Sequence, residues 1–98
     1  MNRIVLLGTG GGPKIWAERS QPSSAIVIGN DVYVIDAGDG VCTQLSKSGI
    51  DTNNIKAIFI THNHSDHVAD LGTLLLISWQ SGHPGKVQCF GPKPINEM

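Results

Sequence analysis

Residues 57–67 read AIFITHNHSDH, and this stretch decides the fold. Its first four residues, 57–60, are apolar whichever way they face, which is typical of a central strand in a covered sheet. The strand leads directly into three of the four histidines of the chain and one aspartate: His62, His64, Asp66 and His67. The sequence therefore predicts a polar cluster at the carboxyl end of a buried strand.

The spacing of these four side chains suits two metal ions. Side chains two residues apart on an extended segment point the same way, so His62 and His64 can bind one ion together. Asp66 and His67 fall where the chain tightens into a following helix, which directs them to a second ion about 3.5–4 Å away. Imidazole and carboxylate ligands suit Zn²⁺, with manganese or iron as alternatives. Four such residues directly after a buried strand argue against a solvated loop of surface histidines.

Short apolar runs alternate with turn residues along the rest of the chain, which predicts a sheet with two helices. The expected strands are Ile4–Leu7, Ala25–Ile28, Val32–Ile35, Ala57–Ile60 and Val87–Phe90. The second and third flank residues 29–31, whose composition is that of a hairpin turn, so they should pair antiparallel. Helical spacing of apolar residues predicts one helix over 41–48, ended by Gly49, and another over 68–80 with a stripe at positions 68, 71, 75 and 79.

Length and composition restrict the protein class. A chain of 98 residues without repeat or linker forms at most one domain, and 40% hydrophobic residues with a net charge of -1 are typical of a soluble globular protein. No apolar stretch reaches membrane-spanning length and the first residues lack a signal-peptide core, so we expect a cytoplasmic protein that does not bind membranes. Cys42 and Cys89 have neither metal-binding nor redox spacing, which predicts reduced, partly buried thiols.

The segment HNHSDH, residues 62–67, fits the pattern His-x-His-x-Asp-His, and on this motif the chain resembles the metallo-β-lactamase superfamily. Two further features lie where that superfamily has them. One is an opening strand that runs into LGTGGG (7–12), and the other is Asp36 within VIDAGDG (34–40). The resemblance covers the whole chain. It implies an α/β (α+β) fold in which residues 1–98 are the N-terminal part of a single domain, the N-terminal half of a four-layer αββα sandwich.

The resemblance also gives each polar side chain a role in a binuclear, water-activating centre. His62 and His64 would bind the first metal, and Asp66 and His67 the second. Asp66 would also act as the catalytic residue that orients or deprotonates the attacking water. Asp36 would support the metal-binding loop from behind, because ligating histidines need a hydrogen-bonded partner. For Asp39, the same duty and a turn-capping role both stay open.

The ligands within this chain are too few for a complete centre. A catalytic zinc normally takes three protein ligands, and each ion here is offered two. We therefore expect the 98 residues to be inactive alone and to belong to a larger hydrolase with two zinc ions. Such a part would leave a sheet edge and an apolar face uncovered, so the expected partners are the missing C-terminal half or a second copy of the chain. The glycines after the first strand fit no nucleotide-binding fingerprint, so no organic cofactor is expected.

Within the superfamily, LLGTGGG (6–12), the paired Ser23 and Ser24, and GPK (91–93) resemble the ribonuclease Z and arylsulfatase-like branch. The first hypothesis is a metal-dependent hydrolase whose anionic substrates are phosphodiester or sulfate esters of small molecules. The second is a transfer-RNA 3′-end processing endonuclease (ribonuclease Z). RNA binding requires basic surface, and seven Lys and Arg against eight acids form no basic stripe, so charge does not support an RNA partner. The third is a catalytically silent fragment that binds metal or a partner chain.

Overall fold

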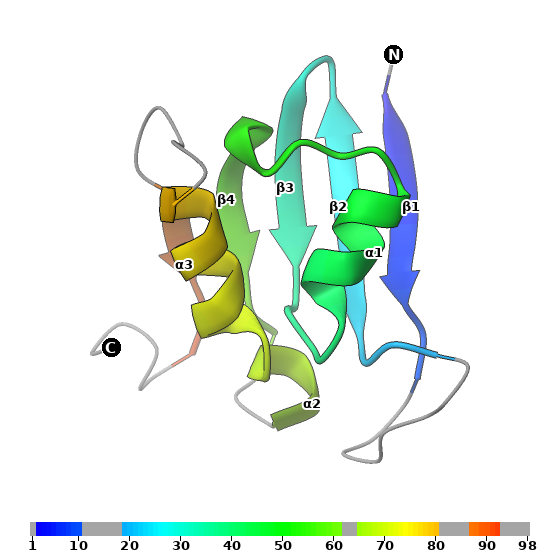
Figure 1. Ribbon diagram of the computed structural model, residues 1–98, viewed down its shortest axis with the longest axis vertical. Coiled ribbons are helices and arrows are strands. Elements are labelled where there is room, and N and C mark those ends of the chain that lie inside the picture. Colours follow the sequence, from blue (N-terminus) through cyan, green and yellow to red (C-terminus); the bar gives the residue numbers. More distant parts are fainter. Residues whose placement is uncertain (1, 11–18, 62–64, 81–86, 93–98) are drawn as a thin grey trace.

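The computed structural model describes residues 2–10, 19–61, 65–80 and 87–92, with the backbone alone at 65, 66, 78 and 80. One five-stranded sheet carries helices on one face (Figure 1). The strands are β1 (Arg3–Gly8), β2 (Ser23–Ile28), β3 (Asp31–Ile35), β4 (Ile55–Phe59) and β5 (Gln88–Phe90). The helices are α1 (Val41–Lys47), the 3-10 turn η1 (Thr52–Asn54), α2 (Ser65–Val68) and α3 (Leu71–Gln80). The mixed α/β class predicted from the sequence is confirmed.

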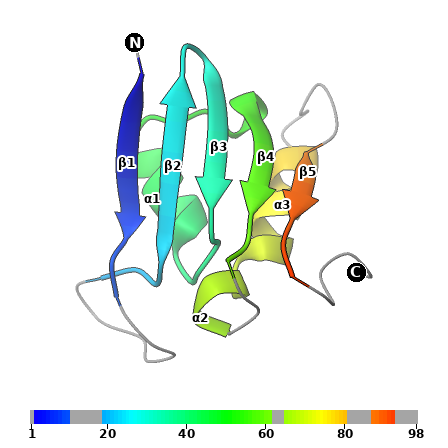
Figure 2. The same cartoon turned by 180° about the vertical axis from the view of Figure 1, so that it is seen from behind.

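The strands follow the order β1-β2-β3-β4-β5, so each strand lies beside its neighbour in the sequence. The first three strands pair antiparallel, and the hairpin predicted between β2 and β3 is confirmed. β3, β4 and β5 pair in parallel, which requires the helical crossovers that connect them. In consequence β1, β3, β4 and β5 run the same way, and their carboxyl ends meet at one edge of the sheet (Figure 2). We call this end of the sheet, which is formed by the ends of strands and not by an outermost strand, the carboxyl edge.

Two predicted boundaries are wrong in detail. The hairpin turn contains only Gly29 and Asn30, because Asp31 already pairs with Ile28 as the first residue of β3. The single helix predicted over 68–80 is divided into α2 and α3 by a turn at residues 69 and 70. Within α3, Leu71 and Leu74 are buried and Leu75 packs against the core while partly exposed, whereas Trp79 is 74% exposed. The predicted apolar stripe is therefore confirmed at Val68, Leu71 and Leu75, which pack on the core, and is wrong at Trp79.

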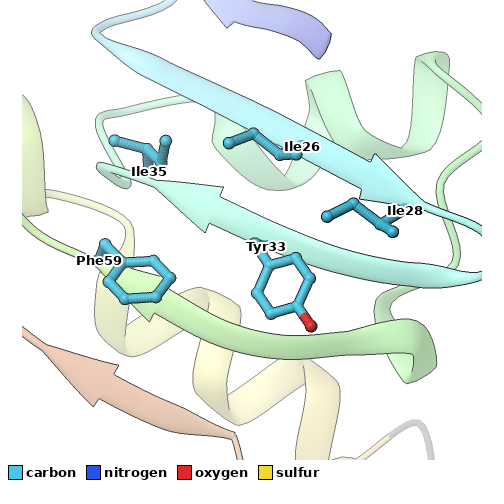
Figure 3. Close-up of a pocket in the computed structure, with 5 residues that line it drawn as sticks. All are labelled: Ile26, Ile28, Tyr33, Ile35 and Phe59. Atoms are coloured by element: carbon cyan, nitrogen blue, oxygen red, sulfur yellow. The ribbon is translucent and has the colours of Figure 1, made fainter. Parts of the chain in front are cut away.

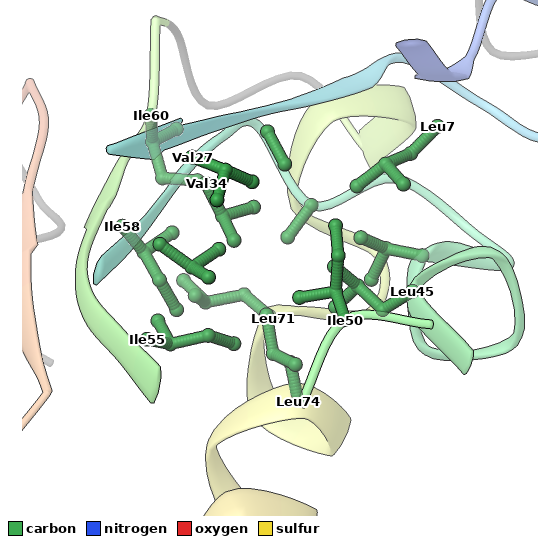
Figure 4. Packing of buried hydrophobic residues seen from close by; sticks show 14 residues of the cluster. Leu7, Val27, Val34, Leu45, Ile50, Ile55, Ile58, Ile60, Leu71 and Leu74 are labelled. Atoms are coloured by element: carbon green, nitrogen blue, oxygen red, sulfur yellow. The ribbon is translucent and has the colours of Figure 1, made fainter. Parts of the chain in front are cut away.

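The core lies between the sheet and the two longer helices (Figure 4). Its largest fully buried side chains come from both layers: Val34, Val41, Leu45, Ile55, Ile58 and Leu74. Full burial of one such side chain contributes about 1.5–3 kcal/mol. Gly49 ends α1 with φ +72°, as predicted, and the next residue, Ile50, returns the chain to the core. Helix α1 is therefore held at its end by both conformation and burial.

The opposite face of the sheet is apolar too, but within the described residues no helix covers it (Figure 2). We call it the open face. Ile26, Ile28, Tyr33, Ile35 and Phe59 line a shallow apolar hollow of about 380 Å³ on this face (Figure 3). The rings of Phe59 and Phe90 stack at 5.2 Å between centroids. A contiguous apolar patch of this kind is typical of a surface that contacts another polypeptide.

None of the described helices is both long enough and apolar enough to cross a membrane.

Candidate metal centre

The structure brings together two of the five predicted site residues. Asp36 directly follows β3, and His67 lies in α2, which stands at the carboxyl edge beyond the end of β4 (Figure 1). His62 and His64 lie outside the described residues, and Asp66 is described by its backbone alone. In the remaining described chain, no three His, Cys, Asp or Glu side chains gather as a metal site would require. The metal roles of all four ligands therefore stay predictions.

Asp36 and His67 form a close, largely buried pair. The imidazole Nδ1 of His67 lies 2.7 Å from the carboxylate Oδ2 of Asp36, and their side chains are 16% and 8% exposed. An ionised carboxylate only accepts hydrogen bonds, so the hydrogen of the imidazole belongs on Nδ1. That tautomer carries the lone pair on Nε2, one of the two ring nitrogens through which neutral histidine binds metal ions. The donor set at His67 thus fits a divalent metal.

Thr61 is a second donor to the same carboxylate. Its backbone N–H donates to Oδ1 of Asp36 at 2.8 Å, and its hydroxyl Oγ1 lies 3.1 and 2.9 Å from Oδ1 and Oδ2. Thr61 immediately precedes the histidine segment, and His67 ends it. One buried carboxylate therefore holds the segment at both ends. The sequence predicted Asp36 as this support but missed Thr61, whose only signal is its place directly before the first histidine.

The backbone of Asp36 adopts a conformation that favours glycine. Its φ is +61°, the one positive value among the described residues other than glycine. Aspartate tolerates this region better than most residues, but the conformation still costs about 1 kcal/mol. The N–H of Asp36 donates to the carbonyl of Phe59 at 2.7 Å, which continues the pairing of β3 with β4 up to this residue. The chain then turns sharply, and the hydrogen bonds of the carboxylate offset the backbone cost.

The loop that follows Asp36, residues 36–40, is bonded to segments on both sides. On one side Gln21, which is buried, pairs with Asp39: the Gln21 N–H donates to the Asp39 carbonyl at 3.1 Å, and the Asp39 N–H donates to Oε1 of Gln21 at 3.0 Å. Asp39 itself is exposed, and its bonds in the described chain run through its backbone. This favours the turn role over the support role for Asp39.

On its other side, the 36–40 loop bonds to the turn between α2 and α3. The Ala37 N–H donates to the His67 carbonyl at 2.7 Å, and the Asp70 N–H donates to the Ala37 carbonyl at 2.9 Å. The Gly40 N–H donates to the carboxylate Oδ2 of Asp70 at 2.8 Å. Sequence reasoning missed Asp70. Its available signal was an acidic residue directly before an apolar helix, the position of an N-cap.

The two cysteines do not take part in the centre. Both are free and half-buried, as predicted. Burial raises the pKa of the Cys42 thiol, and the negative charge of Asp70 raises it further. Burial likewise raises the pKa of Cys89. A raised pKa disfavours the thiolate, so neither thiol is activated as a nucleophile.

The sequence of the chain matches a known protein family. The family model described as "Anti-Pycsar protein Apyc1" matches residues 2–98. The chain belongs to this family. Among curated relatives, Ribonuclease Z of Mycobacterium sp. (strain KMS) is 39% identical over 94 residues, which are 94% of this chain and 33% of the relative. Ribonuclease Z of Mycobacterium marinum is 37% identical over 95 residues, 94% of this chain and 34% of the relative. The chain thus spans about a third of the length of these relatives.

Solved structures show the same fold. The short form of human tRNase Z superposes with a TM-score of 0.82 at 33% identity, over 99% of this chain and 36% of that one. The metallo-β-lactamase fold protein YhfI from Bacillus subtilis superposes with a TM-score of 0.81 at 23% identity, over 96% of this chain and 38% of that one. The resemblance to the ribonuclease Z-like part of the metallo-β-lactamase superfamily is therefore confirmed.

Proposed function

We propose that the protein carrying this chain is a metal-dependent hydrolase of phosphodiester bonds. Its metal centre would hold two zinc ions through His62, His64, Asp66 and His67. The observation that carries the proposal is the buried Asp36–His67 pair, which sets the imidazole in its metal-binding tautomer at the end of the motif. Similarity to proteins named Ribonuclease Z supports the reaction class.

Each residue of the chain has a distinct part in this proposal. When bound, the ions would supply an activated water molecule and positive charge for the phosphate oxygens. His67 would bind through Nε2, because its Nδ1 donates to Asp36. Asp36 would fix both ends of the histidine segment through His67 and Thr61. Asp66 would bind the second ion and take the proton of the attacking water.

The remaining ligands would come from polypeptide outside the 98 residues. The open face supports this part of the proposal, because Ile4 and Leu6 on β1 are 73% and 70% exposed and Phe59 and Phe90 add their rings. An apolar second layer from a longer chain, or from a second copy, would bury that face. Size-exclusion chromatography with zinc titration of the 98-residue chain tests this. A stable monomer that binds zinc tightly and stoichiometrically would contradict it.

For the substrate, we propose a small-molecule phosphodiester, with sulfate esters as a chemically related class. The balance of seven basic and eight acidic residues supports a small anionic substrate over a polyanion, because RNA binding depends on clustered basic charge. A transfer-RNA 3′-end endonuclease is the second candidate. It is favoured by the 33% identity to the short form of human tRNase Z over nearly the whole chain.

The deciding experiment measures hydrolysis of bis(4-nitrophenyl) phosphate, 4-nitrophenyl sulfate and a precursor transfer RNA by the complete protein with zinc. We expect the phosphodiester to be cleaved fastest, and His64→Ala and His67→Ala to abolish turnover and lower the zinc content. His83→Ala, at the one histidine of these 98 residues that lies outside the motif, is the matched control and should leave both unchanged. Undiminished turnover in either motif variant would refute the metal mechanism, and faster cleavage of the transfer RNA would favour the second candidate.

A further inference from the structure

Asp70 connects the two loops that carry Asp36 and His67. It lies in the turn between α2 and α3, half-buried, and three of its groups are bonded. Its N–H donates to Ala37, its carbonyl accepts from Leu74 at 2.8 Å in the first turn of α3, and its carboxylate accepts from Gly40. The last bond joins residues 30 positions apart. Asp70 thus bonds both to helix α3, through Leu74, and to the 36–40 loop, through Ala37 and Gly40.

The direction of the carboxylate is unusual for this position. An aspartate directly before a helix ordinarily accepts a hydrogen bond from the second or third N–H of its own helix. In the described chain, the Asp70 carboxylate instead bonds across to Gly40. A side chain that capped α3 locally would stabilise the helix equally well. The observed bond of the Asp70 carboxylate therefore serves the contact with the 36–40 loop.

Gly40 is closely surrounded on its other side. Its φ is +91°, and a Cβ added there would lie 2.6 Å from Oγ of Ser20. The start of α1 is therefore held between Ser20 and Asp70, which leaves the 36–40 loop little room to shift. Asp36 begins this loop, and His67 begins the segment 67–70, which runs from the end of α2 through the turn at 69 and 70. Bonds at the far ends of both segments therefore keep the two side chains aligned.

We propose that Asp70 is a positioning residue of the metal centre. Its bond to Gly40 fixes the 36–40 loop against the segment 67–70, so that Nδ1 of His67 stays hydrogen-bonded to the Asp36 carboxylate. The inference rests on the proposed function, since it assigns Asp70 to the same centre. Residues that orient metal ligands from behind typically change metal affinity about 10–100-fold when replaced.

Asp70→Ser separates this role from helix capping. Serine caps a helix as well as aspartate does but is one bond shorter, so it cannot reach Gly40. In the complete protein we expect zinc affinity, measured by competition with a chromophoric chelator, to fall about 10-fold. Asp70→Asn keeps an oxygen acceptor without the charge and should lose about threefold or less. Asp51→Ser is the matched control, since Asp51 also caps a helical turn, at the opposite edge of the sheet.

Two magnetic resonance readouts on zinc-free protein test the geometry itself. In Asp70→Ser, the Gly40 amide should lose protection from hydrogen exchange, and the His67 ring should change from one tautomer to a mixture. Asp70→Asn should keep both signals, and provides the test if Asp70→Ser does not fold. An unchanged His67 tautomer, or unchanged zinc affinity, in the serine variant overturns the inference. Equal losses of affinity in Asp51→Ser also overturn it. A wild-type protein that binds no zinc refutes the proposed function instead, and the tautomer readout still decides the role of Asp70.

Discussion

The two edges of the sheet differ in how their loops are held. At the carboxyl edge, loop residues bond to partners far away in the sequence, such as Asp36 to His67 and Gly40 to Asp70. At the opposite edge, the turns are held mainly by short-range bonds: Asp51 bonds to Asn53, and Gly49 bonds to the carbonyl of Ser46. A turn that only reverses the chain needs no distant partner, whereas a centre must hold side chains from several segments at fixed distances.

Burial follows the same division. Asp36 is 6% exposed, but the ion pair between Asp31 and Lys56 at the opposite edge is 3.9 Å long and half-exposed on both sides. Hydrogen bonds to a buried charge are worth more than those made in water, and leaving their donors unpaired is costly. Equivalent substitutions at the two edges should therefore differ in their cost to the free energy of unfolding.

The largest effect is expected for Asp36→Ala. The substitution leaves the Thr61 N–H, the Thr61 hydroxyl and the His67 imidazole without their shared acceptor, so the free energy of unfolding should fall by about 3 kcal/mol. Denaturant unfolding of the zinc-free complete protein measures this. Asp36→Asn tolerates the positive φ and keeps one acceptor oxygen, so it should lose less. Equal losses in the two variants would contradict this, because they would show that an amide oxygen replaces none of the carboxylate's hydrogen bonds and that tolerance of the positive φ contributes little.

The same division explains what the sequence could predict. Strands and helices follow from local periodicity and turn residues, so the five strands and the end of α1 at Gly49 were predictable. The break between α2 and α3 was not predicted: there the Asp70 N–H donates to the carbonyl of Ala37, a residue far away in the sequence, and not within a helix. Thr61 and Gln21 were missed for the same reason: each acts through a partner about 20 residues away or more. Asp36 was found only because the family resemblance placed it.

A smaller effect is expected for Thr61→Val. Valine has nearly the shape of threonine and keeps the backbone bond to Asp36, but it loses the hydroxyl bonds to the carboxylate. A hydrogen bond to a charged group is worth about 1.5–3 kcal/mol when buried, and the exposure of Thr61 reduces this to about 1 kcal/mol. Thr43→Val, on the exposed side of α1, is the matched control and should change stability little. A loss no greater than that of the control would remove Thr61 from the network.

At the opposite edge, Asp51→Ala should cost about 0.5 kcal/mol, the lower end for loss of a helix cap. Among the residues that the structure describes, the Asp51 side chain accepts only from the Asn53 N–H at 2.9 Å, at an exposed turn where water can replace it. Zinc affinity should not change, because Asp51 precedes β4 at the edge away from His67. Unfolding curves and zinc competition on one preparation measure both. A loss comparable to that of Asp36→Ala would mean that the two edges are equally constrained.

The smallest effect is expected for Lys56→Met, which removes the ion pair with Asp31 while keeping the length of the side chain. Exposed ion pairs contribute about 0–1 kcal/mol and are screened by salt, and with both side chains 51% exposed the loss should stay below about 0.5 kcal/mol. It should also shrink as salt concentration rises, whereas the cost of Asp36→Ala should persist, because the Asp36 side chain is buried. Measuring both variants at low and high salt gives the sharpest form of the comparison. If the cost of Asp36→Ala changed with salt concentration, the wild-type Asp36 carboxylate would be in contact with bulk water. The physical basis for treating Asp36 as the support of the metal motif would then be removed.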